Sequence, residues 1–132
     1  DENYIFKTDY SRGQARLSAE RLLKMDKPAS AVFVASDSMA LEVMAVARES
    51  GKEIPRDLSI MGFDDNPSGL YGPVALTTVR QPLIKMAEEG VKKLNLLMNA
   101  KKKVDLEKIM LPTELVIRES CQPLKSADRR LN

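Results

Sequence analysis

Two uninterrupted apolar runs constrain the fold of this chain more than any other feature. They are AVFVA at residues 31–35 and LSIMGF at residues 58–63. Short runs of this kind, bounded by turn-forming residues, are typical of strands that are covered on both faces. The segments before and after the first run instead carry apolar residues at helical spacing, over residues 13–26 and 37–50. This alternation predicts an α/β fold, a parallel sheet flanked by helices with right-handed crossovers.

The rest of the chain continues the alternation. Residues 3–7 are predicted to form a short strand or its tail, and the β-branched residues of 76–79 predict a further strand. Apolar residues at helical spacing then predict a long helix over 83–99. Two closing strands are expected at 108–111 and 114–117.

Composition excludes several classes of protein. Hydrophobic residues make up 43% and charged residues 30%, and the net charge is only +2, from 21 basic and 19 acidic residues. This balance indicates a globular domain without a concentrated nucleic-acid face. Histidine is absent, and Cys121 is the only cysteine. The commonest general base and metal ligand is therefore missing, and we expect no catalytic residue, no metal site and no cofactor.

No segment approaches the roughly 20 apolar residues that a membrane span needs. The chain begins with Asp1 rather than methionine and lacks a signal-peptide pattern. We therefore expect a cytoplasmic piece of a longer protein.

Polar side chains follow the predicted strands where each strand ends. Ser36 and Asp37 follow the first apolar run, Asp64 and Asp65 follow the second, and Gln81 follows the third strand. Ligands of an open α/β sheet gather outside the carboxyl ends of its strands. These residues are therefore candidate ligand contacts, with Asp37 and Asp65 as possible secondary ones.

Two aromatic residues extend this candidate site, Tyr10 before the first helix and Phe63 at the end of the second run. A carboxylate such as Asp64 accepts hydroxyl hydrogen bonds, and aromatic faces cover the C–H surface of a sugar or the plane of a base. The set is suited to a small polyol or heterocycle.

Each candidate also has a plain structural interpretation. Ser36 and Asp37 could cap the following helix, and Asp65 could be a turn former. Gln81 could satisfy loop backbone, and Phe63 could be ordinary core. These alternatives stay open on the residues alone.

The pair Asp64 and Asp65 also allows a different class of function. Adjacent carboxylates could hold Mg²⁺ in a phosphoryl-transfer or receiver-like domain. That hypothesis needs a lysine at a third strand end, where Arg80 stands instead, next to Gln81. It remains an alternative to ligand binding.

Four motifs resemble the lactose/galactose repressor (LacI/GalR) family. They are VASDSMAL at 34–41, IPRDLSIMGFDD at 54–65, LTTVRQP at 76–82 and LPTELVIR at 111–118. They occur in the family's order, and the resemblance extends over residues 8–120.

The resemblance implies one lobe of a periplasmic-binding-protein-like (type I) sensor domain, which is not an enzyme. Residues 1–82 would be the C-terminal lobe, 83–105 a returning helix and linker that packs on the other lobe, 106–125 the closing strands, and 126–132 a polar tail. The implied function is effector sensing in a DNA-binding transcriptional repressor, where a sugar or nucleobase-like effector changes the lobe arrangement and hence operator binding. A helix-turn-helix outside this chain would contact the DNA. A periplasmic sugar-transport protein of the same architecture is the alternative.

The resemblance also implies roles for individual residues. Asp64 matches the family's sugar-binding carboxylate, with Phe63 beside it, Tyr10 at an aromatic stacking position and Gln81 at a pocket-facing position. Ser36 stands where the family commonly has an effector-contacting asparagine, so that contact is expected to be lost or water-mediated.

A homodimer is implied as well, through the helix at 39–47 and the loop at 68–74. The expected interface residues are Met39, Leu41, Met44, Leu70 and Gly72.

Overall fold

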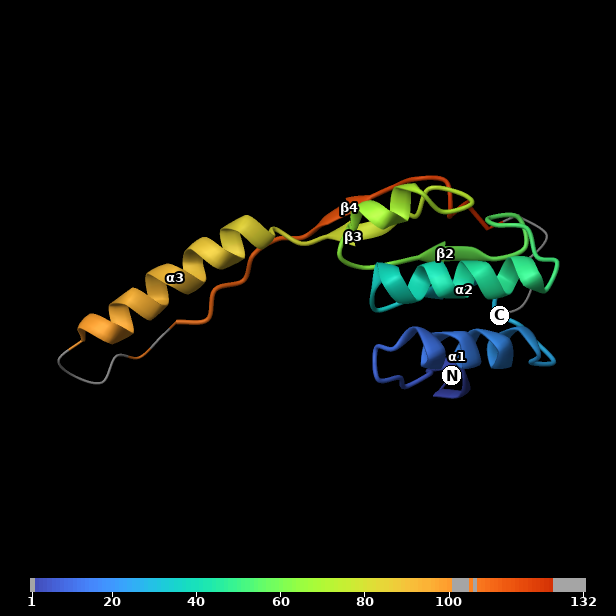
Figure 1. The fold of residues 1–132 in the computed structure, drawn as a ribbon, viewed down its shortest axis with the longest axis horizontal. Coiled ribbons are helices and arrows are strands. Elements are labelled where there is room, and N and C mark those ends of the chain that lie inside the picture. Colours follow the sequence, from blue (N-terminus) through green and yellow to red (C-terminus); the bar gives the residue numbers. More distant parts are fainter. Residues whose placement is uncertain (1, 101–104, 106, 125–132) are drawn as a thin grey trace.

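The computed structural model consists of a body and an arm, joined by two adjacent strands (Figure 1). It describes residues 2–100, 105 and 107–124. The body contains β1 (Ala31–Phe33) and β2 (Ser59–Met61) together with α1 (Arg12–Leu23) and α2 (Asp37–Glu49). The predicted alternation of helices and strands is confirmed.

The body helices begin and end where local chemistry requires. The Ser11 side chain caps α1 by accepting a hydrogen bond from the Gln14 amide at 3.2 Å. Ser36 caps α2 in the same way, with the Met39 amide as donor at 3.4 Å. Gly51 follows α2 with a φ of 73°, which a residue without Cβ adopts at little cost.

The expected parallel sheet is formed by the first three strands. β1 pairs in parallel with β2, Val32 opposite Ile60. Isolated parallel bridges, Met61 to Thr77 and Asp64 to Arg80, extend β2 toward β3 (Thr78–Arg80). β4 (Glu114–Val116) then runs antiparallel to β3.

The core lies on one face of this sheet, against α1 and α2. Val32 and Ile60 point to it, together with the buried helix residues Ala15, Ala19, Val43 and Met44. The prediction that the first apolar run is covered on both faces is wrong. Because successive strand residues alternate between faces, Phe33 lies opposite the helices and is 59% exposed.

The chain returns from β4 into the body through Ser120, which is fully buried. Its hydroxyl donates to the Ile60 carbonyl at 2.5 Å and accepts from the Thr77 amide at 2.8 Å. The Ile60 amide donates to the Ser120 carbonyl at 2.8 Å. Residues 60 places apart are thus joined beside β2.

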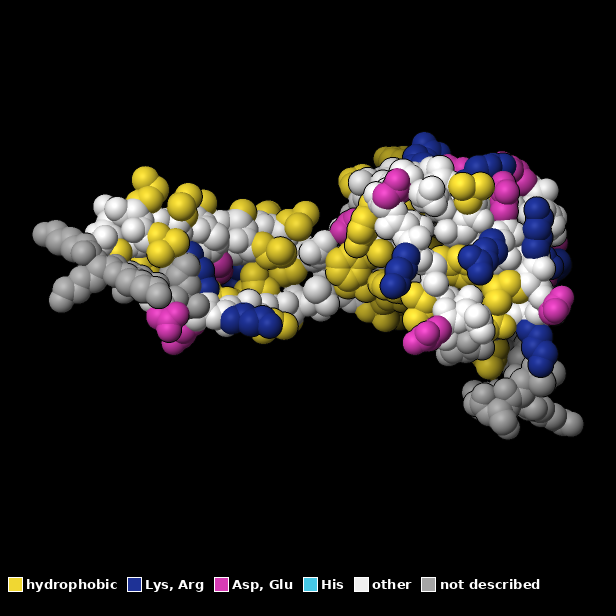
Figure 2. All heavy atoms as spheres, turned by 90° about the horizontal axis from the view of Figure 1, so that it is seen from below, with side chains coloured by type: hydrophobic (Ala, Val, Ile, Leu, Met, Phe, Trp, Pro, Cys, Tyr) yellow, Lys and Arg dark blue, Asp and Glu magenta, His cyan; other side chains and the backbone are white. Residues whose placement is uncertain are grey.

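The arm is α3 (Leu83–Asn99), which has no buried residue. In Figure 1 it extends away from the body, and in Figure 2 apolar side chains are visible along it. No helix among the described residues is long and apolar enough to cross a membrane.

Two predicted strands are absent. Residues 3–7 form no strand, because η1 (Glu2–Tyr4) turns the chain and the Tyr4 hydroxyl bonds to the Lys27 carbonyl at 2.7 Å. Residues 108–111 are also unpaired. Lys93 of α3 donates to the carbonyl of Glu107, so this segment runs beside α3. The backbone groups of a helix bond within the helix, so α3 offers the segment no strand to pair with. The final strand is confirmed, and a short turn, η2 (Pro67–Leu70), precedes β3.

Candidate functional site

Asp64 and Gln81 meet where β2 ends and the chain leaves the body. Gln81 Nε2 donates to Asp64 Oδ1 at 2.7 Å, and both side chains are half-buried. The Asp64 amide donates to the Val79 carbonyl at 2.9 Å, so the sheet aligns the two residues. A carboxylate and a primary amide are thereby placed side by side at the carboxyl end of the parallel strands.

The α2 N-terminus adjoins the same strand end. The Asp37 amide donates to the Phe63 carbonyl at 2.8 Å, which places Ser36 beside the end of β2. The Ser36 hydroxyl acts as the α2 cap, and the Ser36 side chain is half-buried. The capping interpretation left open by the sequence therefore holds for Ser36, next to the candidate site.

Asp37 faces inward. It is 1% exposed, and its two oxygens accept hydrogen bonds from the Thr78 hydroxyl and the Asn66 amide, each at 2.6 Å. A Cβ at Gly62 would lie 2.2 Å from Asp37 Oδ1, so only glycine leaves room for this carboxylate. Asp37 therefore supports the loop that carries Asp64, because its own oxygens are already bonded within the protein.

Asp65 binds two arginines. Arg80 Nε donates to its Oδ2 at 2.6 Å, and Arg118 Nη2 donates to its Oδ1. Burial raises the pKa of Asp65, but the hydrogen bonds from Arg80 and Arg118 outweigh burial and hold this pKa below its ordinary value. Asp65 is thus an ionised partner of two guanidinium groups. The pair of Asp64 and Asp65 does not form the metal site of the alternative hypothesis, because arginine charge already occupies one carboxylate.

Among the residues that the structure describes, no group of three or more histidine, cysteine, aspartate or glutamate side chains could hold a metal ion.

The backbone of this loop is unusual. Asp64 has a φ of 115° and Asp65 a φ of 57°, both in the region that favours glycine. Such residues cost on the order of 1–3 kcal/mol each, and they cluster at ligand sites and switch regions. Tyr10, with a φ of 64°, is a third such residue.

The aromatic candidates lie on the body. Phe63 is half-buried and packs edge-to-face against Phe33, with ring centroids 6.3 Å apart. Tyr10 is 69% exposed and precedes α1, whose N-terminus lies at the same end of the body as that of α2 (Figure 1). Sequence reasoning missed Phe33, because its apolar run indicated a wholly buried strand.

The expected dimer residues fall into two groups. Met39 and Met44 are buried at 5% and 0% exposure and belong to the core of the body. Leu41 and Gly72 are half-buried, and a Cβ added at Gly72 would lie 3.2 Å from Leu41 Cδ2. Leu70 is 52% exposed. Of the five, only the loop residues and Leu41 present surface.

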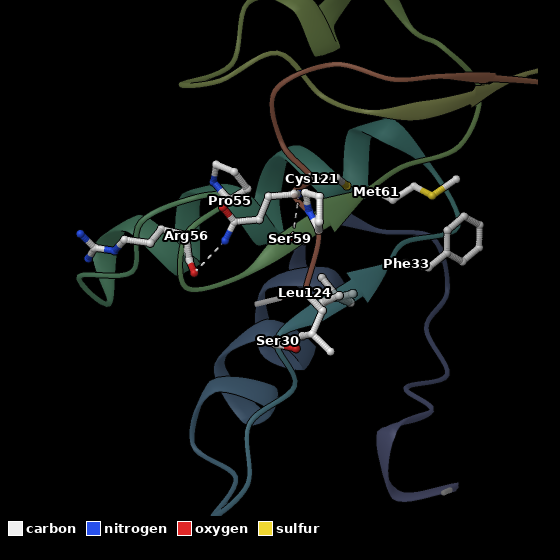
Figure 3. Close-up of a pocket in the computed structure, with 12 residues that line it drawn as sticks. Ser30, Phe33, Pro55, Arg56, Ser59, Met61, Cys121 and Leu124 are labelled. Atoms are coloured by element: carbon white, nitrogen blue, oxygen red, sulfur yellow. Dashed lines mark hydrogen bonds between the residues drawn. The ribbon is translucent and has the colours of Figure 1, made fainter. Parts of the chain in front are cut away.

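A separate groove of about 360 Å³ lies on the face of β1 and β2 opposite the helices (Figure 3). Phe33 and Met61 lie at one end and Arg56 at the other, and Cys121 and Leu124 form part of its wall. Asp64 and Gln81 are not among its lining residues. The groove and the candidate site are therefore different surfaces.

Comparison with known proteins places this geometry in context. Residues 1–121 match the periplasmic binding protein-like domain. The chain is 39% identical over 121 residues to the HTH-type transcriptional regulator MalR of Clostridium butyricum, covering 92% of this chain and 36% of that protein. It thus spans little more than a third of that relative's length.

Solved structures give the same picture. A complex of the transcriptional regulator CelR with cellobiose superposes with a TM-score of 0.84 at 29% identity, covering 91% of this chain and 36% of that one. A LacI family transcriptional regulator from Enterococcus faecium with bound ribose has a TM-score of 0.77 at 30% identity, covering 91% of this chain and 44% of that one.

Proposed function

Because the chain belongs to the periplasmic binding protein-like domain family, we propose that it is the sugar-sensing part of a transcriptional repressor. The resemblance to the lactose/galactose repressor family and the type I sensor fold expected from the sequence are confirmed. The relatives named above are transcriptional regulators, which favours this function over a sugar carrier or an enzyme.

The contact between Asp64 and Gln81 carries the proposal. A carboxylate accepts hydrogen bonds from sugar hydroxyls, and a primary amide both donates and accepts. The 2.7 Å bond between the two side chains fixes their directions. Phe63, half-buried beside Asp64, supplies an apolar face for sugar C–H groups. Tyr10 and Ser36 complete the proposed contact set, with Asp37 and Asp65 supporting the loop.

The arm has a proposed role of its own. Exposed apolar side chains recur along α3, including Leu83 at 58%, Val91 at 65% and Leu94 at 57%. A helix with such a stripe is stable in water only when the stripe is covered. We place the second lobe of the sensor there, so that residues 1–82 form one lobe and 83–105 return to the other. The closing part, 106–125, and the tail, 126–132, include residues outside those that the structure describes.

Effector binding between two lobes would act by a population shift. Contacts made in only one lobe arrangement favour that arrangement, and linked DNA-binding segments respond. In this proposal the protein is a cytoplasmic homodimer that binds operator DNA through a helix-turn-helix outside this chain. The dimer surface would include Leu70 and Leu41.

Sugar titration of the intact protein tests the proposal. Isothermal titration with ribose, glucose and cellobiose should give saturable binding for at least one sugar. Asp64→Asn should weaken this binding by roughly 10- to 100-fold, since a charged hydrogen bond contributes about 1.5–3 kcal/mol. Asp57→Asn is the matched control, because it makes the same charge change at an aspartate that bonds to Arg56 and lies away from the site. Unchanged affinity in Asp64→Asn would refute the site, and no binding of any of these sugars would refute the sugar class.

A further inference from the structure

Two chain segments connect the arm to the body, one outgoing and one returning. β3 leads out to α3 through Gln81, and β4 leads back through Arg118 to Ser120. Since α3 has no buried residue, its position relative to the body depends on these two segments. Whatever fixes both of them to the body fixes the arm.

Asp65 contacts both segments at once. Arg80, at the end of β3, donates to one carboxylate oxygen at 2.6 Å, and Arg118, just after β4, donates to the other. Arg118 also donates to the Leu76 carbonyl at 2.9 Å, and Arg80 pairs with Glu114 of β4 at 3.1 Å. One side chain thus joins the β2 loop to the outgoing and the returning strand.

The surroundings make this contact strong. The Asp65 side chain is 12% exposed and that of Arg118 15%, whereas Arg80 is 48% exposed. Solvent screens the partly buried pair with Arg118 less than it screens an exposed pair. The Asp65 amide also donates to the Thr78 hydroxyl at 3.3 Å, so backbone and side chain both attach to β3.

We propose that Asp65 is a positioning residue that clamps both connecting strands to the loop carrying Asp64. The two aspartates are consecutive, and their amides bond to the Thr78 hydroxyl and the Val79 carbonyl, so Asp65 restrains the backbone that carries Asp64. Movement of the arm therefore reaches the Asp64–Gln81 contact, and a ligand at Asp64 acts on the arm. The functional role of this clamp rests on the proposed sugar-sensing function.

Spin labels on the intact protein test the clamp without any added ligand. Labels at Arg48 on α2 and Glu88 on α3, both exposed, report the distance between body and arm after Cys121→Ser. In Asp65→Asn we expect the fraction of molecules outside the main distance peak to rise about tenfold, because charge-assisted hydrogen bonds are lost. Asparagine tolerates positive φ, so the backbone is not newly strained. Asp57→Asn, which also loses an arginine partner, should leave the distribution unchanged.

A second readout concerns the site itself. The side-chain amide signals of Gln81 in an NMR spectrum should move toward those of an exposed glutamine in Asp65→Asn, and Asp65→Glu should restore part of the shift. If Asp65→Asn fails to fold, Arg80→Gln removes the pairs of the exposed Arg80 with Asp65 and Glu114 but keeps the pair of Asp65 with Arg118. It should broaden the distances to a smaller extent.

A narrow, wild-type distance peak together with an unmoved Gln81 signal in a folded variant would overturn the clamp. Because neither measurement uses a sugar, a failure of the clamp is distinguishable from a failure of sugar binding.

Discussion

Gly62→Ala tests the packing that supports the candidate site. The new methyl group would lie 2.2 Å from Asp37 Oδ1, closer than nonbonded atoms approach, and 3.0 Å from Leu76 Cδ2, which is a tight contact. Leu76 is fully buried and the α2 backbone is fixed, so the carboxylate has to move. Asp37 then loses or lengthens its 2.6 Å bonds to Thr78 and to the Asn66 amide.

The expected cost follows from those two bonds. A hydrogen bond to a charged group contributes about 1.5–3 kcal/mol, so losing both predicts a free energy of unfolding lower by about 3–6 kcal/mol. For a chain of this length each kcal/mol lowers Tm by roughly 3–5 °C, which gives a decrease of about 10 °C or more.

Thermal and urea unfolding followed by circular dichroism measure this effect. Gly13→Ala is the control, because Gly13 lies in α1 with nothing within 4 Å of an added Cβ. The control should stabilise by up to about 1 kcal/mol, as glycine in a helix is costly. A Gly62→Ala variant as stable as wild type would refute the claim that Asp37 requires this space.

Two further predictions concern ionisation. The lowered pKa of Asp65 means that its stabilising effect is present above the ordinary aspartate pKa of about 3.9 and is lost as pH falls through the lower folded value. The stability difference between wild type and Asp65→Asn, followed by urea unfolding at several pH values, should therefore shrink below pH 4. A difference that stays constant with pH would contradict the ion pairs. The hydrogen bond from Arg56 lowers the pKa of Asp57 to about 2. Arg56→Gln should therefore raise the pKa of Asp57 toward its ordinary value in an NMR titration. An unshifted titration curve would show that Arg56 is not the cause.

Local sequence alone determines the ends of the body helices and the order of helices and strands. The helix caps at Ser11 and Ser36 and the left-handed stop at Gly51 depend only on neighbouring residues, and the structure has all three. The parallel strands followed from apolar runs in alternation with helices. Because parallel strands bring their carboxyl ends to one edge, the meeting of Asp64 and Gln81 could also be predicted.

Long-range packing decided the rest. Asp37 and Asp65 are both acidic residues after a strand, yet Asp37 is buried against Thr78 while Asp65 pairs with arginines 15 and 53 residues away. Residues 108–111 have strand-like composition but run beside a helix, which offers no free backbone groups. The partner of a side chain depends on which distant segment packs beside it, and a strand forms only where a second strand lies next to it. Neither can be predicted from the local sequence pattern.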